Sequence, residues 1–81
     1  MTEGPDVGKM VKTLMEQKGV GVTWLAKRLG CHRNNVYLIL NRSWIDTQTL
    51  SKLAFIFEYD FFSDFSQYYN EQIAMKKLNR T

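Results

Sequence analysis

The 81-residue chain contains one cysteine, one histidine and one proline. A single cysteine cannot form an internal disulfide, which fits a reducing compartment. Cys31 and His32 are adjacent, but no second pair follows at the spacing of a zinc site, so we expect no bound metal. No Ser-His, Cys-His or His-carboxylate arrangement indicates catalysis, and no glycine-rich phosphate loop is present. We therefore expect neither an enzyme nor a cofactor, and we see no site for a small-molecule ligand.

Long hydrophobic runs are also missing. The longest apolar segments are far too short to span a bilayer, so we expect no membrane association. The N-terminal segment MTEGPDVGK carries no apolar signal sequence, which predicts a cytoplasmic protein. Strand-like alternation, internal repeats and low-complexity runs are absent as well.

What the chain does contain is helical periodicity. A length of 81 residues with 44% hydrophobic residues is enough for one small domain with one modest core. Apolar residues recur at i, i+3 and i+4, as on the buried face of a helix. The expected helices cover about residues 6–18, 22–29, 33–40 and 46–57, and a fifth begins at residue 61. The fold class is therefore all-α, a compact bundle of about five short helices.

Capping residues support these boundaries. Asp6, His32, Asp46 and Asp60 each lie at or just before the start of an expected helix, where a side-chain acceptor satisfies free backbone N–H groups. For the second helix, the sequence leaves Gly21 and Thr23 as alternative caps. We expect Phe61, Phe62 and Phe65 to close the core. Whether the fifth helix continues to Leu78 is left open by the pattern. The predicted organisation is a flexible lead (residues 1–6), a domain (7–65) and a helical extension or tail (66–81).

Residues 22–41 form the most informative segment. Two short amphipathic helices flank Gly30, which falls where the end of a helix favours a residue that tolerates positive φ. Ala26 is small where the two helices must cross closely. The apolar faces are Leu25, Ala26 and Leu29 on the first helix, and Val36, Ile39 and Leu40 on the second. This pattern is typical of a helix-turn-helix.

Charge is distributed unevenly. Residues 9–44 hold seven Lys or Arg against one Glu, whereas residues 45–74 hold five acidic residues against one Lys. The basic part contains the two-helix segment, and such a concentration of positive charge indicates a polyanionic partner.

The segment resembles the helix-turn-helix of the lambda-repressor/Cro-like family, the Xre-type bacterial and phage regulators. With Val22 as its first residue, the family's small residue falls on Ala26 and its turn glycine on Gly30. The two buried aliphatic residues of its recognition helix fall on Val36 and Ile39. The resemblance covers about residues 7–65 and implies a lambda-repressor-like bundle that binds DNA.

Carried over residue by residue, the resemblance places base-reading positions on Arg33, Asn34, Tyr37 and Leu38. It places phosphate contacts on Asn35, on the loop Asn41-Arg42-Ser43 and at the start of the second helix. There this chain departs from the family. Members often have Thr-Gln at that start, whereas this chain has Gly21 and Val22, so backbone N–H groups and Thr23 would have to hold the phosphate.

Each of these residues has a structural alternative. Arg33 either reads guanine, contacts a phosphate or is a solvated charge, and Asn34 either reads adenine or only fills the first turn of its helix. Tyr37 either contacts the sugar-phosphate backbone, stacks near a base edge, or packs on Arg33 or Trp44. Leu38 either meets a thymine methyl group or covers a neighbouring side chain.

Residues around the recognition helix leave similar choices. Arg42 either contacts a phosphate or is a free surface charge. His32 is either a helix cap or a neighbour of a phosphate. Trp24 and Trp44 lie either at the edge of the core or on a base-stacking platform.

These observations favour sequence-specific binding of double-stranded DNA by a transcriptional regulator, with helix 33–40 in the major groove. One such domain reads few base pairs, so we expect a homodimer on half-sites about 34–36 Å apart. The fifth helix, Phe55 or the tail would form its interface. Two alternatives remain, namely a protein-interaction module of the antitoxin type and a single-stranded RNA binder.

Overall fold

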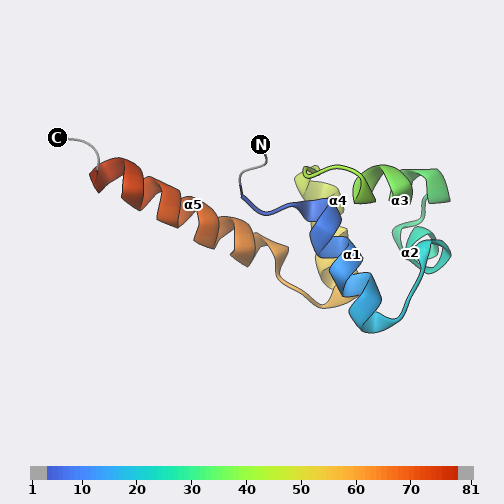
Figure 1. Cartoon of the computed structure of the whole chain (residues 1–81). Helices are drawn as coiled ribbons and strands as arrows, with labels where there is room; N and C mark the ends of the chain where they lie inside the picture. The colour runs from blue at the N-terminus through green and yellow to red at the C-terminus, as the bar shows by residue number, and fades with distance from the viewer. Residues whose placement is uncertain (1–3, 79–81) are drawn as a thin grey trace.

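A computed structural model describes residues 4–78, which form five α-helices and no strand (Figure 1). The helices are α1 (Val7–Lys18), α2 (Val22–Leu29), α3 (Arg33–Leu40), α4 (Thr47–Phe57) and α5 (Phe61–Leu78). The all-α prediction, with the helix-turn-helix at α2 and α3, is confirmed. Within this range no helix is both long and apolar enough to cross a membrane. The expected flexible lead and tail fall partly on residues 1–3 and 79–81, outside the described residues.

Four helix starts carry the predicted side-chain cap, in which one acceptor atom receives a backbone N–H two or three residues ahead. Gly21 precedes α2 and supplies no side-chain cap. Gly19 and Gly30 end α1 and α2 with φ of 73° and 72°, a conformation that costs glycine little. The capping bonds are Lys9 N–H to Asp6 Oδ1 (3.1 Å), Asn34 N–H to His32 Nδ1 (3.1 Å), Thr49 N–H to Asp46 Oδ2 (2.9 Å) and Ser63 N–H to Asp60 Oδ1 (3.1 Å).

The Asp46 cap should make the stability of the protein depend on pH. Hydrogen bonds from the Thr49 N–H and hydroxyl hold the pKa of Asp46 below its ordinary value. Because the folded-state pKa is the lower one, this stabilisation is present at neutral pH and is lost as the pH falls through the folded pKa. We expect Asp46→Asn to reduce the dependence of the unfolding free energy on pH between about 5 and 2. Urea unfolding at neutral and acid pH measures this, and an unchanged dependence would contradict it.

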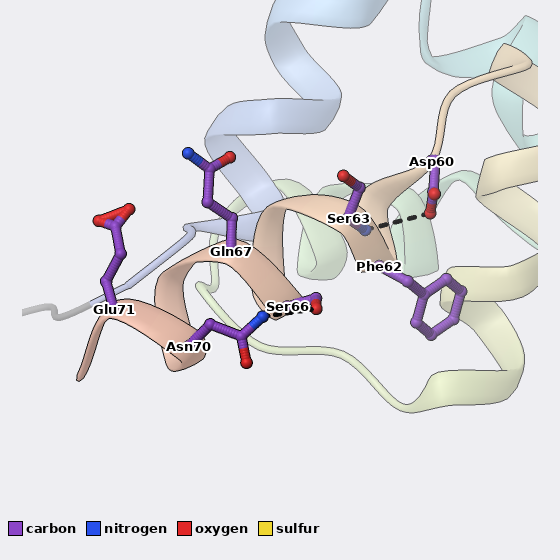
Figure 2. Close-up of a pocket in the computed structure, with 7 residues that line it drawn as sticks. All are labelled: Asp60, Phe62, Ser63, Ser66, Gln67, Asn70 and Glu71. Atoms are coloured by element: carbon purple, nitrogen blue, oxygen red, sulfur yellow. Dashed lines mark hydrogen bonds between the residues drawn. The ribbon is translucent and has the colours of Figure 1, made fainter. Parts of the chain in front are cut away.

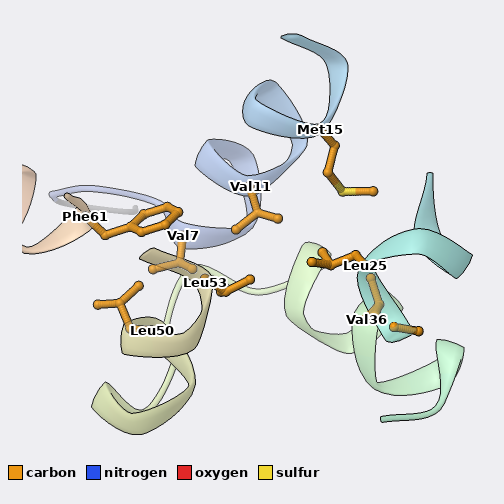
Figure 3. Packing of buried hydrophobic residues seen from close by; sticks show 9 residues of the cluster. Val7, Val11, Met15, Leu25, Val36, Leu50, Leu53 and Phe61 are labelled. Atoms are coloured by element: carbon orange, nitrogen blue, oxygen red, sulfur yellow. The ribbon is translucent and has the colours of Figure 1, made fainter. Parts of the chain in front are cut away.

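The core draws side chains from all five helices (Figure 3). Phe61, at the start of α5, is the largest side chain that is fully buried, and burial of one such side chain contributes about 1.5–3 kcal/mol. The core residues are Val7, Val11, Met15, Leu25, Ala26, Val36, Leu50, Leu53 and Phe61.

One prediction about the core is wrong. Phe62 was expected to close the core with Phe61 and Phe65, but its side chain is 42% exposed. Phe61 is fully buried, and Phe62, about 100° further around the helix, points partly to solvent. Phe65 is partly buried against the core.

Beyond its first turns, α5 projects away from the other four helices (Figure 1). All residues from Tyr69 to Leu78 are exposed. The molecule is accordingly elongated, with principal extents of 52 × 24 × 22 Å. The bundle therefore consists of α1 to α4 and the start of α5, and the helix left open by the sequence pattern continues to Leu78.

Candidate functional site

The α2–α3 unit orients one face of α3 toward solvent. After α2, the N–H of Cys31 donates to the carbonyl of Ala26 at 3.0 Å, which closes the turn at Gly30. Leu25 and Ala26 of α2 and Val36 of α3 are buried in the common core. Burial of this side of α3 fixes the rotation of the helix about its axis, so the opposite side faces outward.

That outward face carries the residues predicted to read bases, together with Asn35, which was predicted to contact a phosphate. Arg33, Asn34 and Asn35 are exposed in the first turn of α3. Tyr37 is 50% exposed and Leu38 is 58% exposed. Guanidinium, amide and phenol groups thus lie together on one short helix, with an apolar side chain among them. These are the groups that pair with base edges and contact methyl groups in a DNA groove.

His32 is exposed and acts as a hydrogen-bond acceptor for α3. Its Nδ1 accepts the Asn34 N–H at 3.1 Å, as the capping prediction requires. A neutral imidazole that accepts at Nδ1 carries its proton on Nε2. His32 can therefore cap α3 and still offer one N–H donor to an outside acceptor.

The loop after α3 is attached to the N-terminal end of α1. The N–H groups of Val7 and Gly8 donate to the carbonyls of Ser43 (3.2 Å) and Arg42 (3.0 Å). Asn41 is exposed, whereas Arg42 and Ser43 are half-buried. These bonds satisfy two free N–H groups of α1 and hold the loop in one position.

Gly8 makes this attachment possible. A Cβ atom at Gly8 would lie 2.5 Å from the carbonyl oxygens of both Leu40 and Arg42. Only a residue without a side chain allows α1 and the end of α3 to approach so closely. Sequence reasoning missed Gly8. A glycine inside a helical pattern, where it lowers helix propensity, was the available signal.

Arg42 is oriented by Trp44. Its guanidinium carbon lies 4.1 Å from the centre of the Trp44 ring, a cation–π contact. Its Nε is buried and has no hydrogen-bond partner among the described residues. Arg42 is thus not the free surface charge that one alternative assumed. Trp44 itself is 63% exposed and supports the arginine rather than the core.

Trp24 has a different environment. It is partly buried against the core, with its ring 6.0 Å from that of Phe57 and 5.1 Å from the Arg28 guanidinium carbon. This places Trp24 at the edge of the core. Thr23, the remaining predicted phosphate contact, is exposed in the first turn of α2.

Two surface hollows differ in how well their charged groups suit a polyanion. One, of about 690 Å³, lies along α5 (Figure 2) and includes the carboxylates of Asp60 and Glu71, which disfavour phosphate. Another, of about 400 Å³, lies beside α3 and includes Asn35, Leu38 and Arg42. Within residues 4–78 no group of three or more His, Cys, Asp or Glu side chains could hold a metal ion.

Comparison with known proteins agrees with this geometry. The family model described as a Cro/C1-type HTH DNA-binding domain matches residues 10–78, a range that includes α2 to α5 and most of α1. No curated protein and no solved structure gives a significant match. The chain therefore belongs to the family of Cro/C1-type helix-turn-helix domains, which bind DNA.

Proposed function

We propose that this protein is a transcriptional regulator that binds double-stranded DNA sequence-specifically, with α3 in the major groove. The observation that carries the proposal is the exposed polar face of α3, whose orientation is fixed by the buried Val36 on its other side. An α-helix fits the width of the major groove, where each base pair presents a distinct pattern of donors and acceptors.

The proposed base contacts follow from side-chain chemistry. Arg33 pairs with guanine through two N–H donors, and Asn34 pairs with adenine through its amide. Leu38 meets the methyl group of a thymine, and Tyr37 lies against the sugar-phosphate backbone. All four side chains are exposed within less than two turns of one helix, so they can contact neighbouring base pairs and the adjoining backbone.

Phosphate contacts position the domain on the duplex. We assign them to Asn35, to Asn41, Arg42 and Ser43 of the loop after α3, and to Thr23 and the backbone N–H groups at the start of α2. The Nε2 of His32 adds a donor beside the first turn of α3. Support comes from the attachment of the loop to α1, which holds its polar groups in place beside α3.

The direct test is selection of bound sequences from a genomic DNA pool at moderate salt, followed by sequencing. We expect enrichment of one short motif, and competition by duplex DNA should exceed competition by single-stranded RNA. If no motif is enriched, or if RNA competes better, the proposal is wrong. Two-fold symmetry in the recovered motif would indicate a dimer on DNA.

A homodimer formed by α5 is part of this proposal. Phe62, Phe65, Tyr69 and Ile73 follow one another at helical spacing and lie on one side of α5. Tyr69 and Ile73 are 53% and 50% exposed on the projecting half of the helix (Figure 1). An apolar stripe of this kind on a projecting helix is typical of a protein interface.

Charge favours a second copy of α5 as the partner, in antiparallel orientation. Asp64 lies in the first turn of α5, and Lys76 and Lys77 lie in its last turn. An antiparallel second copy brings each acidic part toward a basic part, whereas a parallel copy aligns like charges.

We expect Ile73→Glu to weaken self-association by about 30-fold or more, because it places a charge in the apolar stripe. Gln67→Glu is the matched control, since it adds the same charge at an exposed position about 120° around α5 from Ile73. Sedimentation over a concentration series measures the association. A strict monomer, both free and on DNA, would contradict the homodimer.

A further inference from the structure

A third hollow, of about 300 Å³, lies where the N-terminal end of α1 meets the loop after α3. Asp6, Lys9 and Lys12 line one side, and Asn41, Arg42 and Ser43 line the other. Neither lysine belongs to the helix-turn-helix, and the proposed function assigns them no role. The hollow adjoins the C-terminal end of α3, at the loop that would follow the DNA backbone.

The two walls of the hollow are held together by backbone bonds. The Val7 and Gly8 N–H groups donate to the Ser43 and Arg42 carbonyls, and the missing Cβ of Gly8 allows this contact. The lysines of α1 and the polar groups of the loop therefore have a defined spacing before any ligand binds. Such preorganisation lowers the entropic cost of binding.

The hollow is positively charged. Lys9 and Lys12 are exposed, and neither forms an ion pair with any other described residue. The Asp6 carboxylate accepts the Lys9 backbone N–H as the cap of α1. Arg42 adds a third cation, held against Trp44. Two unpaired ammonium groups beside an amide and a hydroxyl form a donor set that suits the oxygens of a phosphate.

We propose that this hollow binds one phosphate of the DNA backbone through Lys9 and Lys12, with Asn41 and Ser43 as further donors. The inference rests on the proposed function and extends it, because α1 becomes part of the DNA interface. The phosphate bound here lies beyond the C-terminal end of α3, on the side of the helix-turn-helix away from α2. It contributes affinity and no sequence preference, as backbone contacts do.

The test compares two variants that each remove two positive charges, Lys9→Ala/Lys12→Ala and Lys76→Ala/Lys77→Ala. The second pair lies at the far end of α5, so it controls for net charge. A single half-site is bound by one protomer, so a weakened α5 dimer does not affect the comparison. Binding to a duplex with a single selected half-site is measured by fluorescence anisotropy over a salt series. We expect the Lys9/Lys12 variant to bind about 10-fold more weakly at moderate salt. The slope of log K against log [salt] should become shallower by about 1, the value for one phosphate.

The control variant should keep the slope of the unmodified protein, and both variants should keep the ratio of specific to non-specific binding. Lys9→Arg/Lys12→Arg should retain most of the affinity, because it keeps both charges. Equal slopes for the two alanine variants would overturn the phosphate site while leaving the proposed function intact. A changed sequence preference in the Lys9/Lys12 variant would overturn it too. Failure of the unmodified protein to bind any duplex would overturn both proposals.

Discussion

Replacing Arg33 and Asn34 together by alanine is expected to abolish recognition of the selected DNA sequence while the protein remains folded. Each good bidentate pair with a base contributes about 1–3 kcal/mol of discrimination, so losing both should cost about 100-fold or more in specific affinity. Both side chains are exposed in the first turn of α3 and lie outside the core. The melting temperature should therefore stay close to that of the unmodified protein.

The measurement is a titration of the selected duplex and of a scrambled duplex at one salt concentration. Specific affinity should fall to the level of the scrambled sequence, because phosphate contacts support non-specific binding. Gln17→Ala/Lys18→Ala is the matched control, since it removes one amide and one cation from the last turn of α1. Full retention of specificity by the Arg33/Asn34 variant would show that α3 does not read the bases. The single variants should each relax selection at one base position.

Gly8→Ala is expected to destabilise the fold strongly, although it adds only one methyl group to a helix. The new Cβ would meet the carbonyl oxygens of Leu40 and Arg42 at 2.5 Å. These are backbone atoms, so relief requires α1 to move away from the end of α3. That movement breaks the bonds from the Val7 and Gly8 N–H groups to the loop. We expect a loss of about 2–4 kcal/mol, which lowers the melting temperature by roughly 10–20 °C.

Gly21→Ala provides the comparison. Gly21 has a φ of −112° and nothing within 4 Å of its Cβ position, so alanine fits there without strain. Replacement of a glycine N-cap by alanine should cost little beside the effect at Gly8. Thermal unfolding followed by circular dichroism compares the two variants. If the two melting temperatures fall by similar amounts, the close approach of α1 to the end of α3 at Gly8 is not the reason that Gly8→Ala destabilises the protein.

Much of the local structure was predictable, because its causes act over a few residues. The apolar residues at i, i+3 and i+4 predicted the helices, and Asp6, Asp46 and Asp60 predicted where three of them begin. The pattern around Gly30 predicted the helix-turn-helix, and the match to the Cro/C1-type family model confirms it. The outward residues of α3 followed from the same periodicity, and their exposure agrees with it.

Contacts between elements were not predictable in this way. The pattern placed Phe61 and Phe62 together, and only packing decided that Phe61 enters the core while Phe62 stays partly exposed. The sequence also left Arg42 as either a phosphate contact or a free charge. Its position over Trp44 depends on how the loop turns after α3.

The sequence alone therefore determined the helices, their caps, the turn at Gly30 and the exposed face of α3, because each depends on neighbours within about one or two helical turns. The tertiary structure alone decided three further features. These are the close approach at Gly8, the hollow shared by Lys9, Lys12 and the loop, and the projection of α5 (Figure 1). The first two join residues about 30 positions apart in the chain, and the third depends on where the core ends. Such features arise when helices pack, and helical periodicity carries no information about which atoms of different helices meet.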